Sequence, residues 1–162
     1  MLVLVLLAAA TQAGGLSWKP PASWPVEARS STMRVATHRI PPAAGDPEPG
    51  ELAIFFFGPE SGSVKANVER WLNQFAPEPG SPESASRVEM VKGIRVTRVS
   101  TEGTYASGMP GQPAAPKHGF ALLGAIAEGP AGNVFFKVTG PRKTVQRAAP
   151  QFDALLRTLA RQ

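Results

Sequence analysis

The sequence predicts an α+β fold in which an antiparallel β-sheet packs between helices as an α/β/α sandwich. Three observations support this prediction. Residues 51–58 and 120–127 are apolar over most of their length, which is typical of strands covered on both faces. Residues 63–76 and the segment from about Lys143 onward repeat apolar residues at helical spacing. Short links join neighbouring strand candidates, and such links favour antiparallel hairpins.

The strands are predicted from alternation and from the turns that separate them. A tight turn at Lys92-Gly93 predicts one hairpin, and residues 128–133 predict a second. On the first hairpin the side chains of Arg87, Glu89, Arg95 and Thr97 are expected to face water. In chain order, the strand candidates are residues 33–40, 51–58, 87–91, 94–101, 120–127 and 134–139.

Two amphipathic helices are predicted. Ser63 is a favourable N-cap for the first, which is expected to run to about Ala76. The second has two possible starts: near Lys143 with a kink at Pro150, or near Pro150 itself with the proline in the first turn. The apolar stripe of the first helix is Val64, Val68, Trp71, Leu72 and Phe75.

Residues 1–15, MLVLVLLAAATQAGG, are typical of a secretory signal peptide. The apolar run is shorter than the roughly 20 residues that a membrane span needs, and small residues precede a cut expected near Gly14. We therefore expect export to the periplasm or the outside of a bacterium, with no integral membrane span after leader removal. Residues 16–162 would form a single α+β domain, whose Trp- and Pro-rich N-terminal extension uses Trp18 or Trp24 to fill the core.

The composition excludes several classes of site. The 162 residues contain no cysteine, which excludes disulfides, a thiolate nucleophile and a cysteine-ligated metal. The net charge of +5 is uneven, because residues 87–162 carry eleven basic and four acidic groups, whereas residues 1–86 carry six basic and eight acidic groups. The basic residues are spread along strands and are not interleaved with exposed aromatic residues, so no nucleic-acid partner is expected.

No motif indicates catalysis, a cofactor or a metal, so the chain is not expected to be an enzyme. The Gly-x-Ser-x-Gly elbow of serine hydrolases is absent, and two glycine spacings that resemble a phosphate-binding loop lack the Lys and Ser/Thr that follow in such loops. His38 and His118 have no partner at metal-ligand spacing, and the carboxylates of Asp46, Glu48 and Glu51 lack the spacing of a calcium loop. An enzyme that uses His118 with a loop carboxylate is the minor alternative.

The segment FFFGPESGSVKANVERWLNQF, residues 55–75, resembles an uncharacterised class of exported bacterial proteins with a PsbP/Mog1-like fold. Residues 120–141 and the closing helix, 152–159, resemble the strand pair and last helix of the same class, so the resemblance covers roughly residues 33–160. It implies an antiparallel sheet between helices and a role as a binding or assembly factor, without catalysis. The matching positions in the first segment are Phe57, Gly58, Gly62, Val64, Asn67, Arg70, Trp71, Gln74 and Phe75.

The expected function is that of an exported, non-catalytic binding or assembly module of the bacterial cell envelope, whose partner is a protein or another envelope component. The alternative is a small-molecule or lipid carrier, in which the Gly- and Pro-rich loop 103–119 covers a pocket for a small apolar ligand lined by Phe and Trp side chains. No residue is expected to be catalytic, to bind a cofactor or to hold a metal. The candidate partner-contact residues are Asn67, Arg70, Arg95, Arg98, Tyr105 and His118.

Overall fold

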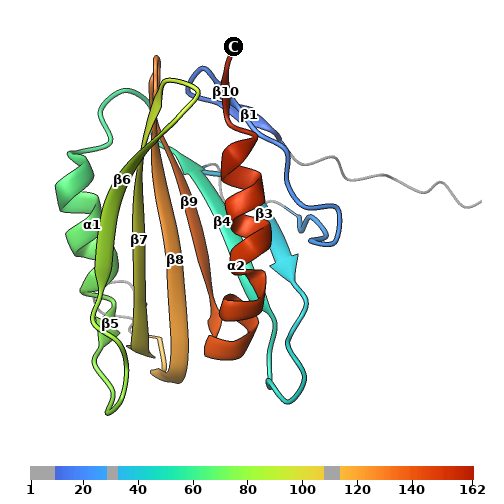
Figure 1. The fold of residues 1–162 in the computed structure, drawn as a ribbon, viewed down its shortest axis with the longest axis vertical. Helices are drawn as coiled ribbons and strands as arrows, with labels where there is room; N and C mark the ends of the chain where they lie inside the picture. The colour runs from blue at the N-terminus through green and yellow to red at the C-terminus, as the bar shows by residue number, and fades with distance from the viewer. Residues whose placement is uncertain (1–9, 29–32, 108–113) are drawn as a thin grey trace, which may run out of the picture.

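The computed structural model describes residues 10–28, 33–107 and 114–162, which form an α+β fold around one large antiparallel sheet (Figure 1). The strand order is β3-β4-β9-β8-β7, and both β5 and β6 pair with β7. The prediction of an α+β fold with an antiparallel sheet is therefore confirmed. In the described residues the sheet comprises β3 (Arg34–Ile40), β4 (Gly50–Phe56), β5 (Phe75–Ala76), β6 (Ala85–Val91), β7 (Ile94–Tyr105), β8 (Lys117–Gly129) and β9 (Gly132–Pro141).

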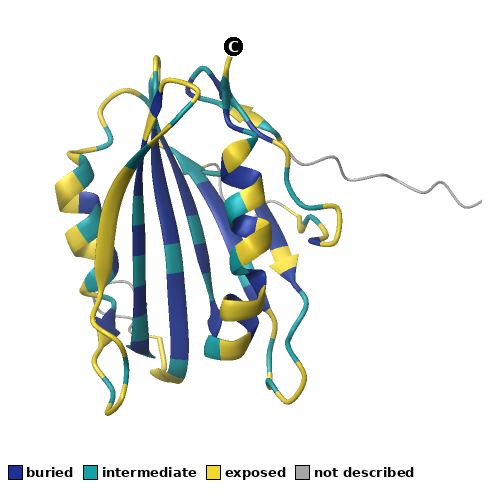
Figure 2. Cartoon of the chain, in the orientation of Figure 1, coloured by how far each residue is buried: buried dark blue, intermediate teal, exposed yellow. Residues whose placement is uncertain are grey.

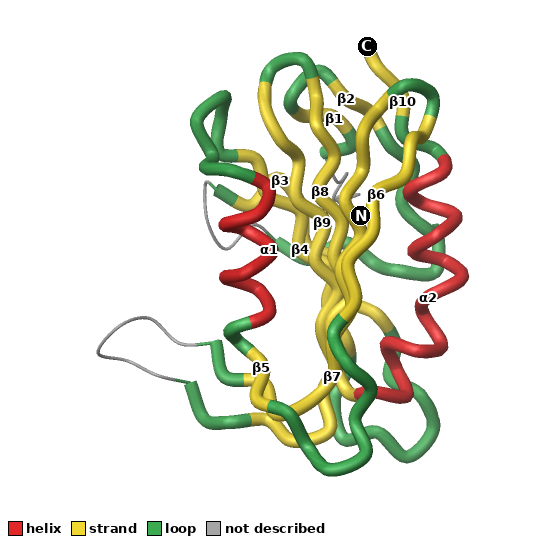
Figure 3. Tube along the Cα trace, turned by 60° about the vertical axis from the view of Figure 1, so that its left-hand side comes forward, coloured by secondary structure: helices red, strands yellow, loops and turns green. Residues whose placement is uncertain are grey.

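Two helices lie on opposite sides of this sheet, as Figure 3 shows. Helix α1 (Val64–Leu72) connects β4 to β5, and helix α2 (Arg142–Arg157) follows β9 directly. A small second sheet brings the described N-terminal residues beside the C-terminus. Its strands are β1 (Gln12–Ala13), β2 (Leu16–Ser17) and β10 (Ala160–Arg161).

The alternation of side chains along each strand divides the core into two clusters. Phe136 and Val138 of β9 join the cluster under α2, whereas Phe135 belongs to the cluster under α1. The central strands are buried along most of their length (Figure 2). Because α1 has only nine residues and α2 has sixteen, α1 covers less of its face. The uncovered part of that face includes Lys137, which neighbours Phe135 on the same side of β9.

Helix α1 begins where the sequence predicts and ends earlier. The Ser63 side chain accepts a hydrogen bond from the Ala66 amide at 3.1 Å, which confirms the predicted N-cap. The helix stops at Leu72 because Phe75 and Ala76, predicted as its last turn, pair with β7 as β5. Phe75 is still buried in the same cluster as Trp71, so the predicted apolar stripe packs on the sheet.

Helix α2 starts at Arg142 and continues through Pro150, so a start near Pro150 is wrong. The inward side chains Val145, Ala148 and Phe152 keep helical spacing across the proline. Pro150 itself is exposed, which places its ring outside the core. The free energy gained when this helix packs against the sheet therefore exceeds the cost of the backbone hydrogen bond that a proline removes from a helix.

The N-terminus of α2 is capped by a side chain from a distant loop. Its N-cap, Pro141, makes no side-chain capping bond, and the Asp46 carboxylate instead accepts hydrogen bonds from the amide of Thr144 at 3.0 Å and from its hydroxyl. We expect Asp46→Ala to lower the free energy of unfolding by about 1–2 kcal/mol, because it removes a cap and a favourable charge at the helix N-terminus. Urea denaturation followed by circular dichroism measures this change.

Glu48→Ala provides the matched control for that experiment. Glu48 lies in the same loop and forms a partly exposed ion pair with Lys117, for which a change below about 1 kcal/mol is expected. Equal losses in the two variants would show that Asp46 does not act as a cap.

The expected leader lies only partly within the described residues, which begin at residue 10. The cut expected near Gly14 falls in the turn between β1 and β2. The carbonyl of Gly14 accepts a hydrogen bond from Ala131 at 3.1 Å, and that of Gly15 accepts one from Gln162 at 3.0 Å. These residues therefore contact the body of the fold, and export and the cut position stay predictions.

The N-terminal extension packs against the α2-side core. Trp18 and Trp24 are both buried, and the Trp18 ring meets Phe136 edge-on with centroids 5.2 Å apart. The Trp24 indole also donates a hydrogen bond to the Gln151 side chain at 3.2 Å. Among the described residues, neither helix is long and apolar enough to cross a membrane.

Two local predictions are wrong. Thr97 is buried and does not face water, because its side of β7 is the face that α1 covers in part. The predicted loop 103–119 is shorter at both ends, since β7 extends to Tyr105 and β8 begins at Lys117. The glycine and proline content of this segment predicts a loop, but its ends belong to β7 and β8, which pair with each other. The pairing includes a register irregularity between Gly103 and Tyr105. Residues 108–113 lie outside the described residues.

Candidate functional site

The part of the sheet that α1 leaves uncovered forms two adjoining depressions. We call the first, with a volume of about 160 Å³, the inner pocket; it is lined by Phe55, Phe57, Arg70, Trp71, Gln74, Phe135 and Lys137. We call the second, of about 370 Å³, the outer cleft; its lining includes Arg34, Glu51, Tyr105, Lys117 and Phe120. They adjoin because the Arg34 guanidinium of the outer cleft lies 5.3 Å from the Phe55 ring centroid of the inner pocket. Together they form the α1-side cleft.

Lys137 is one of the two cations that line the inner pocket. It lies on β9, between Ala53 of β4 and Gly124 of β8, on the face toward α1. Its ammonium group donates hydrogen bonds to Gln74 Oε1 at 2.6 Å and to the Tyr105 hydroxyl at 3.4 Å. The same ammonium lies 5.5 Å from the Tyr105 ring centroid, within the range of a cation–π contact.

Burial lowers the pKa of Lys137 from its usual 10.5 to about 8. The Glu51 carboxylate raises this pKa, while the charges of Arg34 and Arg70 lower it. Glu51 is itself paired with Arg34 at 2.8 Å. Among the described residues, no carboxylate lies within ion-pair distance of Lys137. Lys137 is thus a half-buried cation that, among the described residues, interacts with Glu51 only at a distance and forms no ion pair.

Arg70 supplies the second cation of the inner pocket from the last turn of α1. Its guanidinium donates a hydrogen bond to Asn67 Oδ1 at 2.6 Å. Asn67 is buried, and its amide donates to the carbonyls of Ser61 and Ser63 at 3.0 and 2.9 Å. Asn67 therefore orients Arg70 and does not itself face the pocket. In the described part of the chain, Arg70 also has no carboxylate within ion-pair distance.

Aromatic rings form the walls of the inner pocket. Phe55 and Phe57 stack with centroids 5.8 Å apart, and Phe57 contacts Phe135 at 5.5 Å. Trp71 meets Phe135 edge-on at 6.1 Å. Phe57 remains 40% exposed, which is unusual for so large an apolar side chain beside a buried core. The pocket therefore presents apolar ring surface next to positive charge.

The charges of the outer cleft, in contrast, are largely paired. Arg34 pairs with Glu51 at 2.8 Å, and Lys117 pairs with Glu48 at 2.6 Å. Lys117 also lies 5.3 Å from the Phe120 ring centroid. Burial raises the pKa of Tyr105, which keeps its hydroxyl protonated beside Lys137.

At the end of the sheet, Glu78 joins the ends of β7 and β8. Its carboxylate accepts hydrogen bonds from the Gly119 amide at 2.9 Å and the Thr104 hydroxyl at 2.8 Å, and both lower the pKa of Glu78. Arg142 pairs with the same carboxylate at 3.3 Å. His118 is 82% exposed, with its ring 3.0 Å from the Thr104 hydroxyl. This group of residues connects the two strand ends and lies outside the α1-side cleft.

The structure brings some of the candidate contact residues together and separates others. Arg70 and Tyr105 meet at Lys137, and Asn67 supports Arg70 from behind. Arg98 is only 14% exposed; it points to the α2 side, where it pairs with Asp153 at 2.5 Å and with Glu89 at 3.1 Å. Arg95 pairs with Glu128 at 3.1 Å. The positive charges of Arg95 and Arg98, on the hairpin of β6 and β7, are therefore paired with carboxylates of the same chain.

Lys137 and Gln74 were not among the candidate contact residues, although Gln74 is one of the positions that carry the family resemblance. The signal for Lys137 was a single cation inside the apolar run VFFKV, in a strand of which both faces are largely covered. Such a residue is rare unless it is paired or functional. Gln74 carried no comparable signal, because its side chain meets Lys137 only through the tertiary fold.

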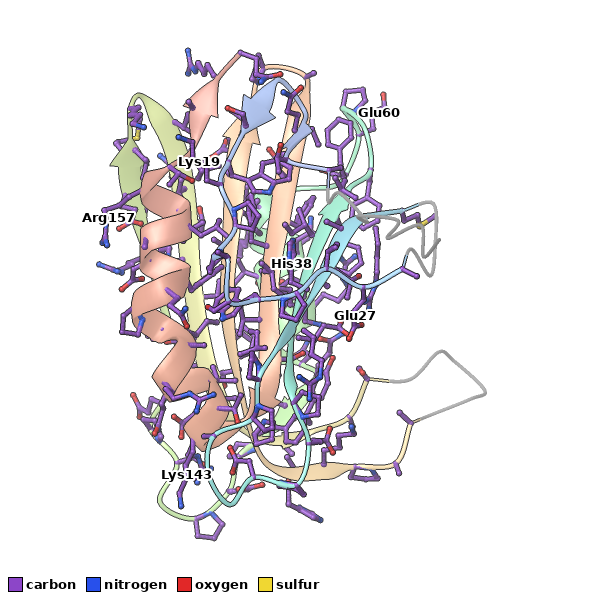
Figure 4. All side chains as sticks on the ribbon, turned by 90° about the vertical axis from the view of Figure 1, so that its right-hand side faces the viewer. Lys19, Glu27, His38, Glu60, Lys143 and Arg157 are labelled. Carbon is purple, nitrogen blue, oxygen red and sulfur yellow. The ribbon has the colours of Figure 1, made fainter. Side chains whose placement is uncertain are left out.

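His38 is buried and interior to the fold, as Figure 4 shows. Its Nδ1 atom lies 3.0 Å from the Trp24 carbonyl oxygen, and its Nε2 atom has no hydrogen-bond partner among the described residues. Within the same residues, no group of three His, Asp or Glu side chains is placed to hold a metal ion.

The inner pocket has Phe and Trp side chains, as expected of the carrier pocket, but no described residue of the loop 103–119 lines it, so a pocket under that loop stays a prediction. The outer cleft, which the described residues Ser107 and Lys117 of the loop region border, is lined largely by charged and polar groups. A separate groove of about 430 Å³ runs between β7, β8 and α2, and Glu102 at its edge pairs with Arg142 at 2.7 Å. Unpaired positive charge next to exposed ring surface distinguishes the inner pocket from these grooves.

Comparison with known proteins concerns the fold. No family model and no curated protein matches the sequence. The solution structure of cyanobacterial PsbP (CyanoP) from Synechocystis sp. PCC 6803 matches with a TM-score of 0.55 at 9% sequence identity, over 96% of this chain and 97% of that chain. The fold is PsbP-like. A Pseudomonas aeruginosa protein of unknown function also matches, with a TM-score of 0.47 at 12% identity, over 92% of this chain and 99% of that chain. At such identities the PsbP-like fold carries no functional residues with it.

Proposed function

We propose that this chain is an exported, non-catalytic binding module of the bacterial cell envelope, built as an α/β/α sandwich, which recognises its partner through the α1-side cleft. The observation that supports this proposal most directly is the pair of cations in the inner pocket, Lys137 and Arg70, neither of which meets a carboxylate among the described residues. Burying a lysine without an anion costs stability, so a bound partner would supply the missing charge.

Binding agrees better than catalysis with the hydrogen bonds of the site. Lys137 contacts an amide oxygen and a phenol, and in the described residues neither a carboxylate nor an imidazole is hydrogen-bonded to it as a general base. Arg70 is held by an amide. These groups can recognise and orient an anion.

Site-specific photo-crosslinking in the cell envelope tests the proposal. A photoreactive phenylalanine analogue at Phe57 lies at the pocket, and the same analogue at Val88 of β6, which is 49% exposed, is the matched control. We expect a discrete cross-linked species from the Phe57 position in the periplasmic fraction. Arg70→Ala is expected to reduce it at least fivefold, and Lys65→Ala, which removes an exposed cation of the same helix, is expected to leave it unchanged.

Two results would contradict this function. Equal cross-linking from the Phe57 and Val88 positions would show that the α1-side cleft is not the recognition surface. Recovery of the chain in the cytoplasm with Met1 intact would overturn export. The carrier alternative, which the ring-lined inner pocket favours, predicts instead a small molecule that remains bound in native mass spectrometry of protein from the envelope.

A further inference from the structure

The inner pocket also specifies the chemistry of what it binds. This inference rests on the proposed function, in that it takes the α1-side cleft as the recognition site. Four properties of the pocket carry it: its charge, its ring surface, its size and the position of Arg70 at the end of α1.

The first step is charge. A lysine ammonium has three donors, of which Lys137 uses two on Gln74 and Tyr105. An arginine has five, and one N–H of Arg70 binds Asn67. The remaining donors of both cations have no carboxylate within reach among the described residues. An anionic group would accept from these remaining donors and balance the charge of both cations.

The second step is the surface beside the charge. Phe55, Phe57 and Phe135 form a continuous set of ring contacts, and the exposed part of Phe57 extends that set toward solvent. Flat apolar groups gain both burial and ring–ring contacts on such a wall. A ring within a few bonds of the anionic group would cover this wall.

The third step is size. The inner pocket, at about 160 Å³, is smaller than the roughly 300–1,000 Å³ of pockets for drug-sized ligands. This size favours a group as small as one aromatic ring with a short acidic side chain.

The fourth step separates a carboxylate from a phosphate. Arg70 lies in the last turn of α1, where the carbonyl ends of the helix give a partial negative charge that disfavours a compact dianion. A guanidinium binds carboxylates and phosphates alike through paired N–H groups, so the charge at the end of α1 is what favours a monoanionic carboxylate over a dianionic phosphate.

We propose that the inner pocket binds an aromatic carboxylate, with Lys137 and Arg70 on the carboxylate and the ring against Phe55, Phe57 and Phe135. The same chemistry occurs in a free aryl-alkanoic acid and in the C-terminal aromatic residue of a polypeptide. Asn67 and Gln74 act as positioning residues, because one holds Arg70 and the other holds Lys137.

Titration with 3-phenylpropionate, followed by calorimetry and by NMR of the pocket residues, tests this proposal. We expect saturable one-to-one binding. Its uncharged analogue 3-phenylpropanamide, the ring-free anion acetate and inorganic phosphate are each expected to bind at least tenfold more weakly. Lys137→Met and Arg70→Ala are expected to weaken binding of the acid at least tenfold, and Arg87→Ala, which changes an exposed cation on β6, is expected to leave it within twofold.

The pH dependence provides a second readout on the intact protein. The charged and titratable groups that face Lys137 are Glu51 from β4, Arg34 from β3, Arg70 from α1 and Tyr105 from β7. Of these, Lys137 is the group that loses its charge near pH 8. The affinity for 3-phenylpropionate is therefore expected to fall between pH 7 and pH 10 in the wild type and to change less than twofold in Lys137→Met.

Two further probes distinguish a free acid from a polypeptide C-terminus. They are a tripeptide that ends in phenylalanine with a free carboxylate, and the same tripeptide with a C-terminal amide. Tighter binding of the free-acid tripeptide than of 3-phenylpropionate would identify a polypeptide C-terminus, and weaker binding would identify a free acid. Equal binding of 3-phenylpropionate and its amide, preference for phosphate, or unchanged binding by Lys137→Met would overturn the proposal. Absence of binding by all these probes would also overturn it, whereas the proposed function would stand if cross-linking at Phe57 still depends on Arg70.

Discussion

Replacing Trp71 by alanine is expected to lower the free energy of unfolding by about 3–5 kcal/mol, the largest stability change that we predict. Trp71 is only 4% exposed and connects α1 to the sheet. Its indole packs directly over Gly124, where a Cβ atom would lie 2.5 Å from Cζ3 of the ring, and it meets Phe135 edge-on. Truncation removes these contacts and leaves a cavity that the short α1 cannot fill by itself. Urea denaturation, followed by circular dichroism, measures the loss.

Gly124→Ala tests the same contact from the side of the sheet. The added methyl group forces the indole or the helix to move, which is expected to cost about 1–3 kcal/mol. In the double variant Trp71→Ala/Gly124→Ala, the added methyl group no longer meets an indole. The combined loss of unfolding free energy is therefore expected to be smaller than the sum of the two single losses. A Trp71→Ala loss below about 1 kcal/mol would instead mean that Trp71 lies on the surface.

Replacing Lys137 by methionine is expected to raise the free energy of unfolding at pH 7, by up to about 3 kcal/mol. The limit follows from the fall in the pKa of Lys137 from 10.5 to about 8, at about 1.4 kcal/mol per pH unit. Lost hydrogen bonds to Gln74 and Tyr105 reduce the gain, so about 2 kcal/mol is expected. A substitution that stabilises the fold and weakens binding is typical of a functional site.

The stability difference between Lys137→Met and the wild type is expected to change with pH. Between about pH 8 and pH 10.5 the unfolded chain binds a proton at Lys137 that the folded chain has released, so wild-type stability rises with pH across this window. Below it both states are protonated, and the full cost of burying the charge is present. The advantage of Lys137→Met is therefore expected to be constant below about pH 7.5 and to decrease toward pH 10.5.

Lys65→Met is the control, because Lys65 is exposed on α1 and its partner Glu69 lies 3.9 Å away. Its stability difference from the wild type is expected to stay below about 0.5 kcal/mol at every pH. If the difference between wild type and Lys137→Met were the same at pH 7 and pH 10.5, the stabilisation would not come from the charge of Lys137.

Much of the candidate site was within reach of the sequence. The helical spacing of residues 64–75 placed Trp71 on the inner side of α1, and the segment that carries Asn67 and Arg70 was recognised as a distinct motif. Tyr105 was selected only as part of a loop, yet the structure places it in β7 beside Lys137. Arg98 was selected for its charge, and the α2 side neutralises that charge with Asp153.

Most helices and strands of this protein are predictable from local patterns, because alternation at a period of two and apolar stripes at a period of 3.6 are properties of contiguous residues. The end of α1 and the extent of β7 and β8 depend instead on strand pairing. The tertiary structure alone decided which of those residues share a site. Strand β9 lies between β4 and β8, and this order sets Lys137 beside Gln74, 63 residues earlier, and Tyr105, 32 residues earlier. Nothing in a local pattern encodes that order, since it depends on how distant strands pair. For the same reason Asp46 caps α2 from 98 residues away.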